Sequence, residues 1–292
     1  MKSFVAFVAI CISWSFSWFA IKTQTSSFVS LYISVCYRMF GVGVILFAIL
    51  VACRQKISIN ANECKNLFII GAINGCFNFI LVYKACEYIP SGIVATMSAT
   101  TIFLSEFIMC VYEKRRPNSI ILLTSITGAI GMFIMFQHNI VNQNFNFIRF
   151  ITGIGLCLVA NLALSCNYII IAINFKRNKT SPLISLCYSS FCSSVFILII
   201  GLFLGGRIIF DFNANYILSL FYLIIFASIV AYSSVYYLNT TIGPAKTGYT
   251  ALVYTPSSMI ISTLFEGWSW HFTSTIGIII ILTSVILGLK SK

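Results

Sequence analysis

Residues 83–95 read YKACEYIPSGIVA and place a lysine, a glutamate and a proline in an otherwise apolar part of the chain. Residues 237–250, YLNTTIGPAKTGYT, repeat the skeleton of a tyrosine, six residues and a proline. At an offset of 154 residues the two tyrosines and the two prolines coincide, as do two threonine positions. Because proline cannot easily continue a helix, each copy predicts a turn between two helices.

The composition indicates an integral membrane protein. The chain of 292 residues is 59% hydrophobic and 8% charged, whereas soluble globular proteins carry about 25% charged residues. Apolar runs of about 20 residues cross a bilayer as helices, and runs such as SIVAYSSVYYL (228–238) lack the alternation of β-barrel strands. We predict an all-α integral membrane protein with ten transmembrane helices, at 4–21, 28–52, 67–86, 91–112, 118–136, 150–173, 183–205, 215–238, 245–265 and 271–289. The first run is expected to be a retained helix, because no small-residue cleavage site follows it.

The distribution of positive charge predicts the orientation. Thirteen of the 18 Lys and Arg residues fall on the side of the two termini, four fall on the other side, and Arg38 lies within a span. Short loops rich in Lys and Arg stay in the cytoplasm, so both termini are predicted to be cytoplasmic. The basic residues lie in six short segments, which favours contact with anionic lipid and gives no indication of nucleic-acid binding. The residue usage is typical of an AT-rich bacterial genome, so we expect the bacterial inner membrane.

This chain lacks the residues that several classes of membrane enzyme need. The one aspartate, Asp211, is predicted in an outer loop, which excludes chemistry that needs paired acids within the membrane. No phosphate-binding loop for ATP and no G-x-S-x-G motif occur, and the two histidines, His138 and His271, lie at span ends. We therefore expect no enzyme activity, no metal site and no cofactor.

The repeated skeleton predicts an internal symmetry. The turn at Pro90 is expected outside and the turn at Pro244 inside, because five spans separate them. A five-helix unit must insert its copy upside down, and inverted repeats with a site at the midplane are typical of secondary transporters. We predict two inverted five-helix repeats, residues 1–142 and 143–292.

The order of several short motifs carries a family resemblance. The motifs are CYRMF (36–40), YKACEYIPSG (83–92), YEKRRP (112–117), Gly128 with Gly131, YTPSSMIISTLFEG (254–267) and Gly277. With these motifs the chain resembles EamA-type carriers of the drug/metabolite transporter (DMT) superfamily along most of its length. The resemblance implies ten helices in two inverted repeats and the transport of small metabolites.

Polar residues within the spans are candidates for a substrate pathway. Polar side chains are costly in lipid and usually face the bundle or a wet cavity. In the span at 215–238 and its end, polar residues recur every three or four positions on one face. The alternative for serine and threonine positions is close helix–helix contact. The pathway candidates are Trp14, Asn74, Asn78, Tyr83, Thr101, Asn161, Tyr168, Ser228, Tyr232, Tyr236, Tyr237, Asn239 and Tyr254.

Two charged residues lie inside the predicted spans, Arg38 and Glu106. A bare arginine at mid-membrane costs at least ~2.5–3.5 kcal/mol, so Arg38 needs a partner. Our hypothesis is that Arg38 and Glu106 pair or share a water cavity. A purely structural pair and a proton-coupling role for Glu106 are the alternatives.

The predicted function is a secondary carrier of a small organic metabolite, which is amino-acid-like. A cavity of hydrogen-bonding groups and aromatic faces with few charges suits such a ligand. Within the class, a carrier of S-adenosylmethionine or another nucleotide-derived metabolite is the alternative. From another class, a membrane-embedded enzyme is disfavoured by the lack of a convergent acid/base set, and a channel by the two-fold repeat. The expected partners are a small-molecule substrate, the lipid bilayer and a second copy of the chain in a homodimer.

Overall fold

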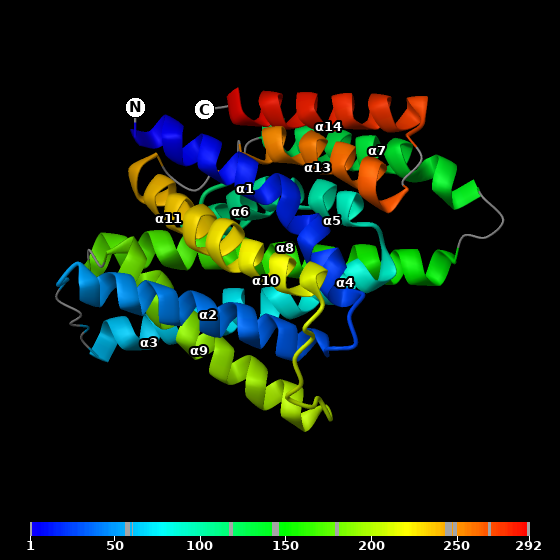
Figure 1. Ribbon diagram of the computed structural model, residues 1–292. Coiled ribbons are helices and arrows are strands. Elements are labelled where there is room, and N and C mark those ends of the chain that lie inside the picture. The colour runs from blue at the N-terminus through cyan, green and yellow to red at the C-terminus, as the bar shows by residue number, and fades with distance from the viewer. Residues whose placement is uncertain are drawn as a thin grey trace.

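The structure is a bundle of helices. The computed structural model describes residues 2–55, 59, 61–116, 119–141, 146–178, 181–242, 247, 250–267 and 270–290. Within these residues the chain is helical and contains no strand, which confirms the predicted all-α class. Both termini lie at the same end of the bundle (Figure 1).

The helices follow the apolar runs of the sequence. Their bounds are α1 (Lys2–Thr25), α2 (Leu31–Ala52), α3 (Ala61–Ile70), the π-helix η1 (Gly71–Asn78), α4 (Phe79–Tyr88), α5 (Ser91–Met97), α6 (Thr100–Tyr112), α7 (Ser119–Val141), α8 (Phe147–Asn178), α9 (Pro182–Phe203), α10 (Ala214–Ile224), the π-helix η2 (Ile225–Val230), α11 (Ala231–Thr241), α13 (Thr250–Glu266) and α14 (Phe272–Lys290).

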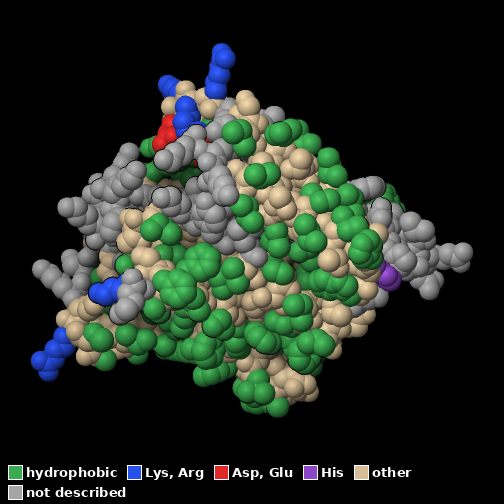
Figure 2. Space-filling view, turned by 90° about the horizontal axis from the view of Figure 1, so that it is seen from above, with side chains coloured by type: hydrophobic (Ala, Val, Ile, Leu, Met, Phe, Trp, Pro, Cys, Tyr) green, Lys and Arg blue, Asp and Glu red, His purple; other side chains and the backbone are tan. Residues whose placement is uncertain are grey.

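Six helical stretches of the described chain are long and apolar enough to cross a membrane, judged by length and composition. They are Lys2–Thr25, Leu31–Ala52, Glu63–Tyr88, Phe147–Ile171, Leu183–Phe203 and Ala214–Thr241. Apolar side chains cover the broad middle of the face in Figure 2, and the Lys and Arg side chains stand at its margins. These features indicate a multi-pass membrane protein. The full count of ten spans and their inverted repeat stay predictions.

Two π-helical segments interrupt long helices. The segment η1 joins α3 to α4, and η2 joins α10 to α11. They begin at Gly71 and Ile225, which are 154 residues apart, the same offset that aligns the two copies of the tyrosine–proline skeleton. Short π segments within α-helices are uncommon and occur often at functional sites. The last residue of η1, Asn78, lines the cavity described below, and η2 accepts hydrogen bonds from two of the lining residues.

Close packing between α7 and α14 depends on small residues. The two helices pack along each other near the top of the view in Figure 1. A Cβ atom added at Gly277 would lie 2.5 Å from Cβ of Met135 and 2.6 Å from the carbonyl oxygen of Gly131. Since part of this contact is backbone, the helices would have to move apart to make room. Helix pairs in membranes use small residues in this way.

We therefore predict that Gly277→Ala destabilises the protein by about 1–3 kcal/mol through overpacking. The matched control is Gly155→Ala in α8, where nothing lies within 4 Å of the added Cβ. The control should leave stability unchanged or raise it, because alanine is the better helix former. Apparent melting temperatures of the purified proteins in detergent measure both. Equal melting temperatures for the two variants would show that the α7–α14 contact is looser than described.

Candidate functional site

A small cavity lies at the centre of the bundle. Its volume is about 40 Å³, which is room for about three water molecules. The residues come from α1, α2, η1, α4, α8, α11 and α13, together with the turn after α5. They are Trp14, Ser17, Trp18, Ile21, Arg38, Asn78, Phe79, Val82, Ser98, Asn161, Leu164, Tyr232 and Tyr254. The walls thus include helices from both halves of the chain.

Aromatic rings form one wall of the cavity. The Trp14 ring meets the rings of Tyr232 and Tyr254 edge to face, with centroids 5.6 Å and 5.4 Å apart. Phe79 meets Tyr232 in the same way at 5.9 Å. Edge-to-face contacts stabilise a fixed ring arrangement. The indole Nε1 of Trp14 donates to the carbonyl oxygen of Ala227 in η2 (3.3 Å), which ties α1 to this segment.

Two asparagine side chains form a polar wall. Asn78 Nδ2 donates to the carbonyl oxygen of Ala160 (2.7 Å). Asn161 Nδ2 donates to the carbonyl oxygen of Met97 (2.7 Å) and to Thr100 Oγ1 (2.9 Å), on either side of the break between α5 and α6. Because these bonds use the amide nitrogens, the amide oxygens are left as the acceptors on this wall.

Arg38 supplies the positive charge of the cavity. Its side chain is buried on α2, and its Nε donates to Ser228 Oγ of η2 (2.9 Å). The guanidinium carbon lies 4.3 Å from the centre of the Phe79 ring, a distance that gives a cation–π interaction. Two helices of the first half and η2 of the second half therefore meet at this one side chain.

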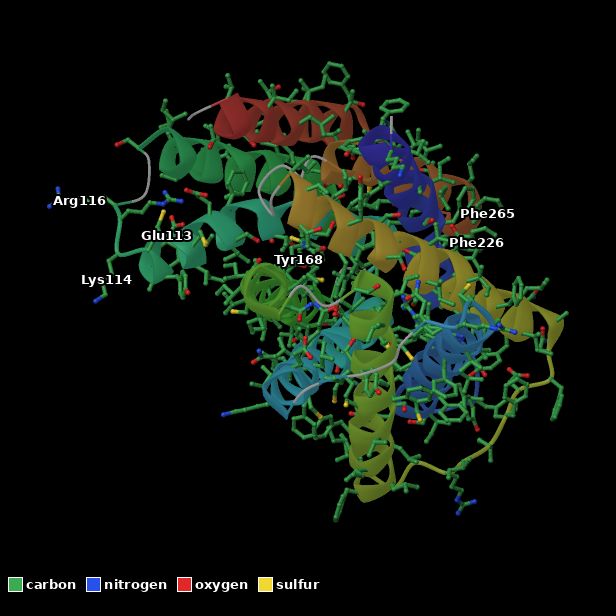
Figure 3. The ribbon with its side chains drawn as sticks, turned by 90° about the vertical axis from the view of Figure 1, so that its left-hand side faces the viewer. Glu113, Lys114, Arg116, Tyr168, Phe226 and Phe265 are labelled. Carbon is green, nitrogen blue, oxygen red and sulfur yellow. The ribbon has the colours of Figure 1, made fainter. Side chains whose placement is uncertain are left out.

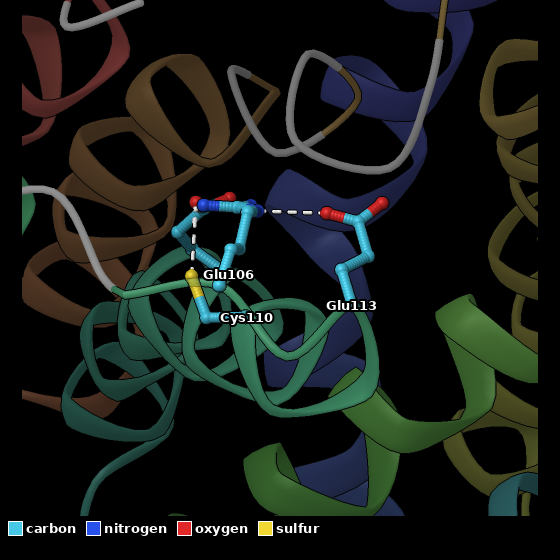
Figure 4. A network of polar contacts seen from close by, with 4 residues as sticks. Glu106, Cys110 and Glu113 are labelled. Carbon is cyan, nitrogen blue, oxygen red and sulfur yellow. Dashed lines mark hydrogen bonds and ion pairs between the residues drawn. The ribbon is translucent and has the colours of Figure 1, made fainter.

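The hypothesis that Arg38 pairs with Glu106 is wrong. Glu106 Oε1 instead lies 2.6 Å from Nη2 of Arg115, whose Nε lies 2.7 Å from Glu113 (Figure 4). Cys110 Sγ also donates to Glu106 (3.5 Å). The hydrogen bonds from Arg115 to Glu113 and then to Glu106 raise the pKa of the guanidinium. This cluster lies where α6 ends, and Figure 3 shows Glu113, Lys114 and Arg116 at an edge of the bundle. It holds the chain after α6 and contributes nothing to the cavity lining.

The predicted pathway residues separate into two groups. The cavity is lined by Trp14, Asn78, Asn161, Tyr232 and Tyr254, and Ser228 touches it through its hydrogen bond to Arg38. The candidates outside the cavity lining are Tyr83, Thr101, Tyr168, Tyr236, Tyr237 and Asn239, and the side chain of Asn74 lies outside the described residues.

Most residues outside the cavity lining are nevertheless buried. Tyr83 is fully buried and donates to Gln24 Oε1 (2.8 Å). Tyr168, which Figure 3 shows among the helices, is also buried, as is Asn239, whose amide atoms have no hydrogen-bond partner. Tyr237 is partly exposed. Polarity within a span therefore predicted burial better than it predicted cavity lining.

The sequence interpretation missed the apolar part of the lining. Ile21, Phe79, Val82 and Leu164 line the cavity, yet an apolar residue in an apolar helix carries no signal of its own. For Phe79, the position directly after the π segment is the one structural mark. These side chains line the cavity because the fold brings α1, α4 and α8 together with α2, which carries Arg38.

A carboxylate joins the two halves beyond the cavity. Glu266, the last residue of α13, accepts hydrogen bonds from the backbone N–H of Ser91 (3.0 Å) and from its hydroxyl, at the start of α5. Ser262 Oγ donates to the same carboxylate (3.2 Å). Farther along the same helix pair, the hydroxyls of Ser98 and Tyr254 lie 2.8 Å apart. We call the Glu266–Ser91 contact the α5–α13 latch.

The fold and the cavity define a multi-pass helical membrane protein with an internal polar site. Residues 1–137 match the model of the EamA-like transporter family, which belongs to the DMT superfamily. No curated protein matches the chain. A crystal structure described only as that of a protein is similar to this chain, with a TM-score of 0.70 and 12% identity, over 98% of this chain and 95% of the other. That likeness concerns the fold alone.

The latch generates a stability prediction. Glu266→Ala should destabilise the protein by about 1–3 kcal/mol, because it leaves Ser91 without its charged partner. The matched control is Glu87→Ala, which removes an ion pair within α4 (Lys84–Glu87, 2.7 Å) and should cost less than about 0.5 kcal/mol. Melting temperatures in detergent measure both variants. A Glu87→Ala variant as unstable as Glu266→Ala would show that the latch adds nothing specific.

Proposed function

We propose that the protein is a secondary transporter of a small, amino-acid-like organic metabolite that works by alternating access. In this proposal ten transmembrane helices form two inverted five-helix repeats, residues 1–142 and 143–292. The membrane is the bacterial inner membrane, and both termini are cytoplasmic. The match of residues 1–137 to the EamA-like transporter family supports the transporter class.

The observation that carries the proposal is the position of the cavity. Side chains of the first half (Trp14, Arg38, Asn78) and of the second half (Asn161, Tyr232) line the same small space. A carrier needs a site that both halves share, because their relative rocking exposes it to one side and then to the other. A volume of about 40 Å³ is too small for an amino acid, so binding requires the halves to move.

Two further features support the inverted repeat. The π segments η1 and η2 begin 154 residues apart, at corresponding positions of the aligned halves. Both termini lie at one end of the bundle (Figure 1), as an even number of spans requires. In the proposed repeat these interruptions fall at equivalent points of the two halves. Asn78 of η1 lines the cavity, and η2 accepts hydrogen bonds from the lining residues Trp14 and Arg38.

The α5–α13 latch supplies a contact that such a cycle would break and re-form. It joins a helix of the first half to a helix of the second half at a single carboxylate. Along the same pair of helices, Thr255 Oγ1 donates to the carbonyl oxygen of Ala95 (3.5 Å). Since this seam lies on the side of the Pro90 turn, we assign it to the closure of the outer face.

Counterflow in proteoliposomes tests the proposal. The purified full chain is reconstituted into liposomes that are preloaded with one unlabelled amino acid or with S-adenosylmethionine, and uptake of the same labelled compound is followed. We expect preloading to raise the initial uptake rate several-fold for one group of amino acids, because a loaded carrier returns faster than an empty one. Protein-free liposomes are the control.

The outcomes separate the candidate functions. Counterflow of S-adenosylmethionine alone would favour the alternative substrate. Uptake without any effect of preloading would indicate a channel. The absence of uptake for every compound in the panel would contradict the proposed function.

The proposed topology can be tested with native cysteines. Cys53 and Cys64 are exposed, after α2 and in α3, and we expect a membrane-impermeant maleimide to label them in inside-out vesicles but not in right-side-out vesicles. Phe212, between α9 and α10, is 82% exposed, and Phe212→Cys in a background with Cys53→Ser and Cys64→Ser should show the opposite pattern. Labelling of Cys53 from the outside would refute cytoplasmic termini.

A further inference from the structure

The Arg38 guanidinium is buried without a carboxylate partner. The residue is 2% exposed, Nε donates to Ser228, and Nη1 has no hydrogen-bond partner. None of the ion pairs between described residues includes Arg38. The hydroxyl of Tyr83 lies near enough to interact with the guanidinium, but it carries no charge that could balance it.

These contacts stabilise the charge only in part. A hydroxyl acceptor and an aromatic face are neutral, so they reduce the cost of burying the guanidinium and leave its charge unbalanced. The guanidinium presents its N–H groups in a planar fork that matches the two oxygens of a carboxylate. A buried Nη1 without a partner therefore marks a position at which an anionic group is missing.

The cavity walls show what kind of ligand would supply that group. No Asp or Glu is among the residues that line the cavity, and Arg38 is their one formal charge. A polyanion would require several such cations, whereas a cationic ligand would meet a like charge. The rings of Trp14, Tyr232 and Tyr254 offer an apolar surface next to Arg38, and the amide oxygens of the asparagine wall can accept from an ammonium group.

We infer that Arg38 binds the carboxylate of a small substrate with a single carboxylate, whose apolar part lies against the aromatic wall. An α-amino acid satisfies the whole site, because its ammonium group would donate to the amide oxygens of Asn78 and Asn161. The inference rests on the proposed transport function, since it assigns the substrate class to the same cavity. Ser228 and Phe79 position the guanidinium, and Arg38 makes the contact.

Ligand-induced stabilisation of the purified full chain in detergent tests the inference. The probes are L-alanine, L-phenylalanine and 3-phenylpropionate, and the matched compounds without a carboxylate are L-alaninamide, L-phenylalaninamide and 3-phenyl-1-propanol. We expect at least one carboxylate to raise the melting temperature in a saturable way, while its match does not. Binding of 3-phenylpropionate as tightly as L-phenylalanine would show that the ammonium group is dispensable and leave the carboxylate contact supported.

Variants of Arg38 connect the stabilisation to this residue. In Arg38→Met the concentration for half-maximal stabilisation should rise about 10- to 100-fold, the effect of losing hydrogen bonds to a charged group. Without ligand, Arg38→Met should melt at or above the wild-type temperature, because an unbalanced buried charge is removed. Arg38→Lys keeps the charge but loses the fork, and it should bind with intermediate affinity. Arg149→Met, at an exposed position near Tyr88, is the matched control and should bind as the wild type does.

The results distinguish this inference from the proposed function. Equal stabilisation by the carboxylates and their matches, no stabilisation by any carboxylate, or unchanged binding in Arg38→Met would overturn the inference. If counterflow succeeds while Arg38→Met binds normally, the proposed transport function is supported and the proposed role of Arg38 is contradicted. If carboxylates bind through Arg38 but no counterflow occurs, the binding site is supported and the proposed transport function is contradicted.

Discussion

Arg38 places a positive charge in the interior of a helical bundle whose outer surface is largely apolar. A bare arginine at that depth costs at least ~2.5–3.5 kcal/mol, and the structure brings Ser228 and the Phe79 ring to it from two other helices. The contacts of α4 and η2 with this one side chain of α2 meet that requirement in part. The helices α2 and α4 also line the cavity, so the buried charge and the site share the same helices.

Backbone geometry contributes to the site as much as side chains do. The η2 segment supplies both Ser228, which accepts from Arg38, and the Ala227 carbonyl, which accepts from Trp14. The η1 segment ends at Asn78, and Phe79 follows it directly. Interruptions of a helix inside a membrane require other groups to satisfy the freed backbone atoms. In η2 the indole of Trp14 donates to the Ala227 carbonyl, and in η1 the hydroxyl of Ser193 on α9 donates to the Gly71 carbonyl (2.9 Å).

The sequence predicted the helical class because apolar runs of membrane-spanning length leave little alternative. It also identified Arg38, Asn161 and Tyr254, since polar groups are too costly in lipid to occur there without a reason. It could not identify Phe79, which differs in nothing from the other apolar residues of its helix. The wrong pairing of Glu106 with Arg38 has a different origin. The sequence shows that Glu106 lies within a span, but it does not show that the chain turns back after α6 and brings Arg115 to this carboxylate.

An experimental structure of the protein with its transported substrate tests the account most directly. We predict density for a carboxylate at about 2.7–2.9 Å from the Arg38 guanidinium, with the rest of the molecule beside Trp14, Tyr232 and Tyr254 in a cavity wider than the present one. A substrate bound away from Arg38, with the guanidinium paired to a carboxylate of the chain itself, would contradict the account.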